Sequence, residues 1–402
     1  MPQPSVEQPL SGIRILDLGT FIAAPFAATV LSEFGAEVIK VEQPGRGDPL
    51  RNFGTPSRGS DTLCWMSEAR NKRSITLDLR QPQGAAILRE LVRRCDVLCE
   101  SFRPGTLEEW GLGFDALLRE NPKLTMLRVS GFGQTGPLRD RPGFARIAHA
   151  FAGLAHLTGM PGEAPLTPGS TSLADYVSGL YGAIGILLAL RVRDRVGGQC
   201  IDLALFESIF RILDDLAPAY GQNGTVRGRQ GMGTSAACPH GHFLCGDDRW
   251  IALACSSDKL FARFARMIGR PELAAPEAYG RVEQRLTARE LIDTVTRDWA
   301  ASRTMAEAVD ACNSVGVPCA PVQTVADIFA NEQFAEREVL LTLADPRVGD
   351  VVVPNALPKL SRTPGSVRHL GPTLGEANHY VYRSLLGMSE ERVRDLQRAA
   401  II

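Results

Sequence analysis

Several common features are scarce in this 402-residue sequence, and each absence excludes a class of protein. Basic residues number 44 and acidic residues 45, so no excess of positive charge is available to bind nucleic acid. The longest apolar run, residues 179–190, is about half of the ~20 residues that a membrane-spanning helix needs. The four tryptophans are too dispersed to form a stacking platform for bases. We therefore expect no nucleic-acid partner and no membrane span.

Disulfide and metal-site patterns are also missing. The nine cysteines are an odd number scattered over a long chain, which is typical of reduced thiols in the cytoplasm. Residues 1–9 carry neither the basic nor the apolar segment of a secretory signal. His240 and His242 lie between Cys238 and Cys245, but this spacing matches no standard zinc site. We expect a cytoplasmic protein with no metal and no permanently bound cofactor.

What the sequence does contain is an alternation of strand and helix patterns in its first third. Short β-rich runs occupy residues 13–18, 37–41, 74–79, 96–99 and 124–129, and helical spacing occupies residues 25–34, 84–94 and 114–119. Such alternation predicts an α/β fold with a parallel sheet and helices on both faces. We predict a Rossmann-like large domain from residues 1–220 and 330–402, with a smaller α+β domain at 225–325.

One Rossmann hallmark is absent from the first expected strand–helix turn. Residues 19–25 read Gly-Thr-Phe-Ile-Ala-Ala-Pro and lack the G-x-G-x-x-G run that brings backbone against a pyrophosphate. An NAD-dependent enzyme therefore remains an alternative without its main motif.

Polar motifs follow or precede several of the expected strands. Residues 71–74 (Asn-Lys-Arg-Ser) offer three kinds of donor that suit a phosphate-bearing ligand, although a solvated charge cluster would look the same. Ser101, Phe102 and Arg103, and the glycine-rich run 130–137, follow strands at the edge where open α/β sheets bind ligands.

Asp175 opens a glycine-rich helical pattern at residues 175–193. A helix N-terminus stabilises a carboxylate, so we expect Asp175 to be ionised and available as a nucleophile. An aspartate at this position is more often a cap or a first-turn residue. The pattern alone leaves both roles open.

Together these motifs resemble the class III CoA-transferases, the family of formyl-CoA transferase and carnitine CoA-transferase. The similar segments are residues 10–17, 34–42, 71–74, 101–105, 131–137 and 173–179, and the likeness extends from about residue 10 to about residue 390. Residues 141–148, 237–243 and 258–263 also resemble the members that move CoA from succinyl-CoA to L-malate or citramalate.

The resemblance implies a mechanism and a set of site residues. Asp175 would attack an acyl-CoA thioester and would then carry CoA as an aspartyl thioester, between two mixed anhydrides. The family's CoA site would fall on Phe21, Ile22, Gln43, Asn71, Lys72, Arg73, Ser74, Ser101, Phe102 and Arg103. The substrates would be acyl-CoA and a small carboxylic acid. An interlocked homodimer is implied too, with a paralogous second subunit as a further possibility.

A dicarboxylic substrate would need donors for its second carboxylate. Arg146, His240 and His242 are the candidates, although Arg146 could equally be a surface residue of its helix. The glycine loop that family members use to stabilise oxyanions has its nearest counterpart at Gly231 and Gly233.

Three positions depart from the formyl-CoA transferase pattern. Ile22 replaces a glutamine near the reacting acyl group, which argues against oxalate or formate as substrate. Glu109 and Ser130 replace a phosphate-binding arginine and a lysine, so Arg103 or Arg139 would have to supply phosphate contacts.

Two alternatives within the same resemblance stay open. α-Methylacyl-CoA racemases pair the aspartate with a histidine where this chain has Phe144, so the proton shuttle would lack a partner. A CoA-binding protein without activity is the other. The acceptor is undecided among L-malate, citramalate, mesaconate, itaconate and glutarate, because one methyl or hydroxyl changes discrimination by only about 1–3 kcal/mol.

Overall fold

The structure is a computed structural model that describes residues 7–59, 61–169 and 171–402. The chain divides into two compact units. The first contains the chain up to Leu154, Pro168–Asp215 and Ala335–Ile402, and the second contains Ala155–Thr167 and Leu216–Phe334. We had assigned residues 155–167 to the large domain. They group with the second unit instead, where Gly231 N donates to Gly159 O (3.1 Å) and Arg229 Nη1 to His156 O (3.1 Å).

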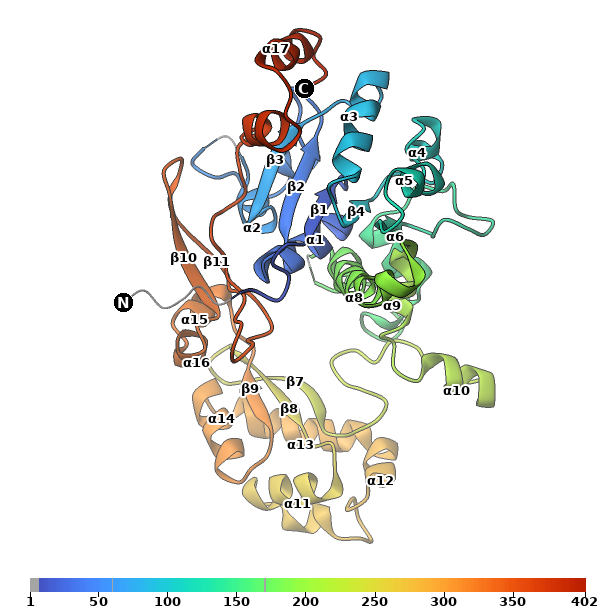
Figure 1. The fold of residues 1–402 in the computed structure, drawn as a ribbon. Coiled ribbons are helices and arrows are strands. Elements are labelled where there is room, and N and C mark those ends of the chain that lie inside the picture. The colour runs from blue at the N-terminus through green and yellow to red at the C-terminus, as the bar shows by residue number, and fades with distance from the viewer. Residues whose placement is uncertain (1–6, 60, 170) are drawn as a thin grey trace. The chain divides into compact units, whose positions relative to one another are not determined.

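A six-stranded sheet forms the centre of the first unit. Its strands follow the order β3-β2-β1-β4-β5-β6, and every neighbouring pair is parallel (Figure 1). This is the strand order of the Rossmann fold, so the predicted parallel α/β layer is confirmed. The strands are β1 (Arg14–Asp17), β2 (Glu37–Glu42), β3 (Lys72–Thr76), β4 (Val97–Glu100), β5 (Thr125–Ser130) and β6 (Gln199–Ala204).

Alternate residues of each strand supply two apolar cores, one on each face of the sheet. Leu16 and Leu98 pack with α3 (Pro82–Val92), α5 (Phe114–Glu120) and the C-terminal segment. Ile15 and Val97 pack with helices of the other face, which are α1 (Ala23–Glu33), α6 (Ala145–Phe151), α8 (Leu173–Val196) and α9 (Leu205–Phe210). Helices cover both faces of the sheet, as parallel sheets require, and bury most residues of β1, β2, β4 and β5, whereas the edge strand β6 stays partly exposed.

The longest helix of the described chain, α8, lies close against α1. A Cβ on Gly179 would meet the Ala23 carbonyl oxygen at 2.9 Å, so only glycine permits this approach. By length and hydropathy α8 could cross a membrane, which the run 179–190 alone did not indicate. However, eight of its residues are buried against the rest of the unit. Its other side exposes an apolar stripe of Leu180, Ile184, Leu187 and Leu188.

The first unit is completed by an antiparallel hairpin of β10 (Leu340–Asp345) and β11 (Gly349–Pro354), by η3 (His379–Leu385) and by α17 (Glu390–Arg398). Only the last helix had been expected in this region. The hairpin escaped prediction because prolines interrupt the pattern around it. Shorter helices of this unit are η1 (Pro49–Asn52), α2 (Leu63–Glu68) and α4 (Thr106–Glu109), while α7 (Leu154–Leu157) and α16 (Glu332–Glu336) lie where the chain passes between the units.

The second unit has its own antiparallel sheet, in the order β7-β8-β9. The strands are β7 (His240–Leu244), β8 (Trp250–Ala254) and β9 (Cys319–Pro321), of which the last was not predicted. They pack on an apolar core with α11 (Asp258–Met267), α13 (Arg289–Ala301) and α14 (Met305–Ser314). The remaining helices are α10 (Leu216–Asn223), η2 (Pro271–Ala274), α12 (Val282–Thr287) and α15 (Val325–Phe329).

Candidate active site

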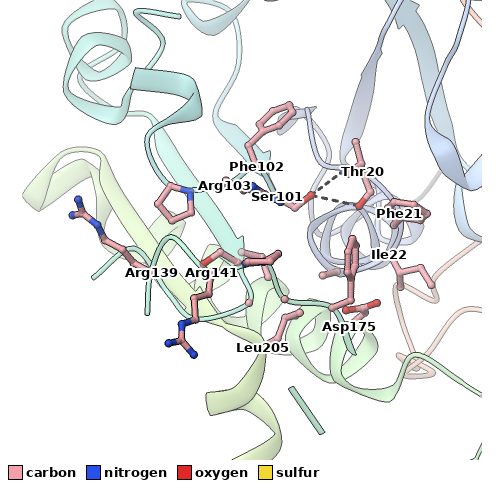
Figure 2. Close-up of a pocket in the computed structure, with 18 residues that line it drawn as sticks. Thr20, Phe21, Ile22, Ser101, Phe102, Arg103, Arg139, Arg141, Asp175 and Leu205 are labelled. Atoms are coloured by element: carbon pink, nitrogen blue, oxygen red, sulfur yellow. Dashed lines mark hydrogen bonds between the residues drawn. The ribbon is translucent and has the colours of Figure 1, made fainter. Parts of the chain in front are cut away.

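The strand order of the large sheet reverses between β1 and β4, and ligands of open α/β sheets bind in the crevice at such a point. A hollow of about 180 Å³ lies there, between the loops that follow β1, β4 and β5 and the start of α8 (Figure 2). Its lining comprises residues 20–23, 101–104, 129–131, 139, 141–144, 175 and 205. All of them belong to the first unit.

Three hydrogen bonds fix the loop that follows β1. Asp17 Oδ1 accepts from Gly19 N at 3.1 Å, Ser101 Oγ accepts from Thr20 N at 2.9 Å, and Asp48 Oδ1 accepts from Phe21 N at 3.1 Å. Phe21 has φ +61°, a left-handed conformation that costs energy for a bulky residue. The surrounding structure therefore determines the loop, and with it one wall of the hollow.

Buried charges lie beneath that loop. Lys40 Nζ is 2.9 Å from Asp48 Oδ2 and 3.7 Å from Asp17 Oδ1, while Lys72 Nζ is 2.8 Å from Asp17 Oδ2. These four side chains are at most 3% exposed. Burial opposes the charge of Lys40, but Asp17, Asp48 and Glu42 outweigh burial and raise its pKa. For Lys72 burial dominates and lowers the pKa. The cluster is balanced and closed to ligands.

Asp175 lies in the first turn of α8 and lines the hollow. It is 9% exposed, and no hydrogen bond or ion pair engages its carboxylate within the described parts of the chain. Burial raises its pKa to about 7, whereas the position at a helix start had led us to expect a carboxylate held in its ionised form. Removal from water outweighs the helix terminus here. In Figure 2 Asp175 lies on the same side as Ile22, and the guanidinium groups of Arg139 and Arg141 point away from it.

Half of the predicted CoA residues share this hollow with Asp175. They come from the loops after β1 and β4, and they are Phe21, Ile22, Ser101, Phe102 and Arg103. Gln43 lies outside the lining, and its carbonyl accepts from Arg46 N and Gly47 N in a turn after β2.

The segment 71–74 does not offer the side chains that the phosphate hypothesis needs. Lys72 and Ser74 alternate onto the core side of β3, where Lys72 pairs with Asp17 and Ser74 donates to Glu42. Neither can act as a free phosphate donor, which corrects that prediction for their side chains. Asn71 is likewise engaged, by Ser366 O and Arg368 N.

Arg73 alternates outward and remains half exposed. It lies 3.3 Å from Glu37 and stacks over the ring of Tyr380 at 4.7 Å. Together with Asn71 it lines another hollow, near the amino-terminal ends of β2 and β3. The Asp175 hollow lies at the carboxyl ends of the strands, where ligands of such sheets bind. Arg73 therefore lines a different hollow, at the opposite edge of the sheet.

The three predicted substrate residues lie elsewhere. Arg146 is exposed on α6 and is not part of the lining of the Asp175 hollow. His240 and His242 belong to β7 in the second unit, where they line a hollow with Gly233. Their role stays a prediction.

Some lining residues were not among the predicted site residues. Nothing in the sequence pointed to Leu205, and Arg141 was marked only as part of the similar segment 141–148. Gly131 and Gly143 lie face to face, since a Cβ on Gly131 would be 2.8 Å from Gly143 Cα. This contact closes the 131–143 loop. Ser130 Oγ is buried there without a hydrogen-bond partner in the described chain, so it is available to a ligand.

Comparison with known proteins agrees with this geometry. The family model described as CoA-transferase family III matches residues 10–378. The chain is 54% identical over 397 residues to the beta subunit of succinyl-CoA–L-malate CoA-transferase from Chloroflexus aurantiacus, covering 98% of each chain. It is 51% identical to the alpha subunit of that enzyme, covering 98% of this chain and 92% of the subunit.

A solved structure shares the fold as well. A CAIB/BAIF family protein from Brucella suis superposes with a TM-score of 0.83 at 29% identity, covering 94% of this chain and 100% of that protein. The parallel sheet, the crevice with its buried aspartate and the match over residues 10–378 lead to one conclusion. The chain belongs to CoA-transferase family III and is a class III CoA-transferase.

Proposed function

We propose that this enzyme moves CoA from succinyl-CoA to a small dicarboxylic acid such as L-malate or citramalate, with Asp175 as the nucleophile. The observation that carries the proposal is a buried carboxylate with no partner among the described residues, in the crevice where this fold binds ligands. The names of the two similar subunits support the choice of donor and acceptor.

In the proposed reaction an Asp175 carboxylate oxygen attacks the thioester carbonyl, the C–S bond breaks, and CoA leaves as a thiolate. The thiolate then attacks the aspartyl carbonyl of the mixed anhydride, which releases succinate and leaves an aspartyl-CoA thioester. The acceptor carboxylate displaces CoA to form a second anhydride. Attack of the thiolate on its acceptor carbonyl frees Asp175 and gives the new thioester. Covalent catalysis divides one difficult exchange into easier steps.

The surroundings of Asp175 favour this role. A carboxylate paired with lysine or arginine would lose nucleophilicity, but Asp175 has no such partner in the described chain. Its raised pKa also makes the ionised form more basic. Backbone N–H groups of a glycine loop would stabilise the oxyanions that develop, and Gly231 and Gly233 remain our candidates for that loop.

The phosphates of CoA need cations at the other end of the site. Arg103, Arg139 and Arg141 line the hollow, and Arg139 lies 3.5 Å from the exposed Asp140. We propose that these guanidinium groups hold the phosphates, since arginine forks match phosphate oxygens. These arginines would supply the phosphate contacts that Lys72 and Ser74 cannot make, because the side chains of Lys72 and Ser74 are engaged by Asp17 and Glu42.

The racemase alternative loses support at Phe144. Its ring lines the hollow and packs edge-on against Phe21, with centroids 6.0 Å apart. An apolar ring at this position cannot exchange a proton with the substrate.

We further propose that the enzyme works as a dimer. The apolar stripe of α8 exposes 44–65% of each of its four side chains, which is more than a lone soluble helix usually leaves in water. The chain is almost equally similar to two subunits of one enzyme, so a homodimer or a pair with a paralogue would both fit. Native mass spectrometry of the chain expressed alone distinguishes them: a dimer supports the homodimer, and a monomer that is inactive until a paralogue is added supports the pair.

The function is tested with purified enzyme, succinyl-CoA and an equimolar panel of L-malate, citramalate, mesaconate, itaconate and glutarate, scanned by mass spectrometry for new CoA thioesters. Malyl-CoA or citramalyl-CoA with matching release of succinate supports the proposal. Intact succinyl-CoA with no new thioester, from a sample that is dimeric, contradicts it. Solvent deuterium entering a 2-methylacyl-CoA without acceptor would indicate the racemase.

A further inference from the structure

The start of α8 lacks the cap that its own sequence could have supplied. The first N–H groups of any helix have no partner within the helix, and a serine at the N-cap commonly accepts from one of them. Ser172 occupies the N-cap of α8, but its side chain makes no capping hydrogen bond. Its carbonyl oxygen accepts from Asp175 N at 2.9 Å, and the preceding amide of Ala174 is left to another group.

That group comes from a different helix. His149 of α6 accepts from Ala174 N through Nε2 at 3.0 Å. The ring is 2% exposed, and its other nitrogen, Nδ1, has no hydrogen-bond partner among the described residues. Ala174 immediately precedes Asp175, so this bond anchors the turn that carries the nucleophile.

We infer that His149 is a positioning residue, which holds Asp175 in the hollow by capping the first turn of α8 from α6. This inference rests on the proposed role of Asp175 as nucleophile.

The choice of imidazole has a physical reason. A carboxylate cap would place a second negative charge beside Asp175 and disfavour its ionised form, whereas a neutral ring adds no charge. Because Nε2 accepts, the neutral ring carries its proton on Nδ1. Burial, with help from Arg146 one turn earlier on α6, lowers the pKa of His149 and keeps the ring neutral.

The test compares His149→Gln with His149→Leu. A glutamine amide oxygen can accept from Ala174 N, and a leucine fills similar space without an acceptor. We expect His149→Leu to lower kcat about tenfold or more with little change in KM for succinyl-CoA, because a small misplacement of a reacting group can cost up to about 100-fold. His149→Gln should stay within about threefold of the wild-type kcat, since the hydrogen bond is restored.

A second measurement is independent of activity. Hydrogen–deuterium exchange of the peptide that covers residues 171–180 should accelerate in His149→Leu and stay near wild type in His149→Gln. Unchanged exchange in a folded His149→Leu protein would overturn the cap. Faster exchange with an unchanged kcat, or equal loss of kcat in both variants, would overturn the positioning role. If wild-type enzyme transfers no CoA, the proposed function fails, and the exchange experiment still decides whether His149 holds this turn.

Discussion

The first unit buries carboxylates in two different ways at one crevice, beneath its wall and in its lining. Asp17 and Asp48 lie under the loop after β1, each beside a lysine ammonium and each accepting backbone N–H groups of that loop. Asp175 lies in the hollow lining with neither kind of partner in the described chain. A paired buried carboxylate is fully committed to structure, whereas an unpaired one remains available for chemistry.

The paired carboxylates and Asp175 both shape the same crevice. The lysine–aspartate cluster holds Phe21 in a left-handed conformation, so the wall of the hollow is rigid before any ligand arrives. Asp175 is then removed from water by that wall and by α6 and α8. Its raised pKa is therefore a consequence of tertiary packing around a group that packing leaves unpaired.

The largest expected effect concerns the unpaired carboxylate. Replacing it in Asp175→Asn should reduce CoA transfer on the order of 10³-fold or more, because a neutral amide cannot form the anhydride. The assay is succinate release from succinyl-CoA with L-malate. Asp194→Asn is the matched control, since Asp194 lies near the end of the same helix and is exposed beside Lys123. Equal activity in Asp175→Asn would remove Asp175 from the mechanism.

The paired carboxylate should respond in stability instead. Asp17→Asn leaves Lys72 without its carboxylate partner and Lys40 with Asp48 alone, so we expect a loss of about 3–5 kcal/mol in the free energy of unfolding. Urea unfolding measures this loss. Asp194→Asn breaks an exposed pair and should cost less than about 1 kcal/mol. Similar losses in the two variants would show that the buried cluster contributes no more than a surface pair.

The pH dependence of activity tests whether the pKa of Asp175 is raised. The pKa of Asp175 is raised to about 7, and the ionised form is the nucleophile. We therefore expect kcat/KM for succinyl-CoA to fall about tenfold per pH unit below pH 7 and to level off above it. The measurement is the pH profile of initial rates from about pH 5 to about pH 9, which covers roughly two units on either side of that pKa. A profile that is flat down to about pH 5 would mean that Asp175 is ionised throughout.

The smallest expected effect is a gain in stability in Asp175→Asn, which is opposite in sign to the loss expected for Asp17→Asn. Because the folded pKa of Asp175 lies above its unfolded value, the folded state binds the proton more tightly, and stability falls as pH rises through about 7. At about pH 8, Asp175→Asn should therefore raise Tm by a few degrees, where 1 kcal/mol corresponds to roughly 2–4 °C. The gain should shrink as pH falls and disappear below about pH 3, under the ordinary aspartate pKa of about 3.9, where the wild-type carboxylate is protonated in both states. A lower Tm at pH ~8 would show that Asp175 has a stabilising partner.

Local pattern was enough for much of the large sheet and for part of the site. Strand residues such as Ile15 and Leu16 alternate between the two cores, and this period-two apolar signal is visible in the sequence. Ser101 was a predicted site residue because it follows a strand, and the carboxyl ends of parallel strands meet at one edge, whereas Phe21 was predicted only through the family resemblance. The β10–β11 hairpin was missed, because the prolines around it interrupt the strand pattern and its pairing is set by contacts between the strands.

Residue types and their places in the chain were enough to identify the groups that could react. They are an aspartate at the start of a glycine-rich helix, charged residues beside strands, and polar loops that follow strands. The tertiary fold determines which of these side chains are engaged in structural contacts and which remain free to react. It pairs Lys72 with Asp17 inside the core, gives Asp175 no partner from residues 7–59, 61–169 and 171–402, and caps α8 with His149 of another helix. The physical reason is that side-chain charge and reactivity depend on burial and on partners, and both come from residues far away in the sequence.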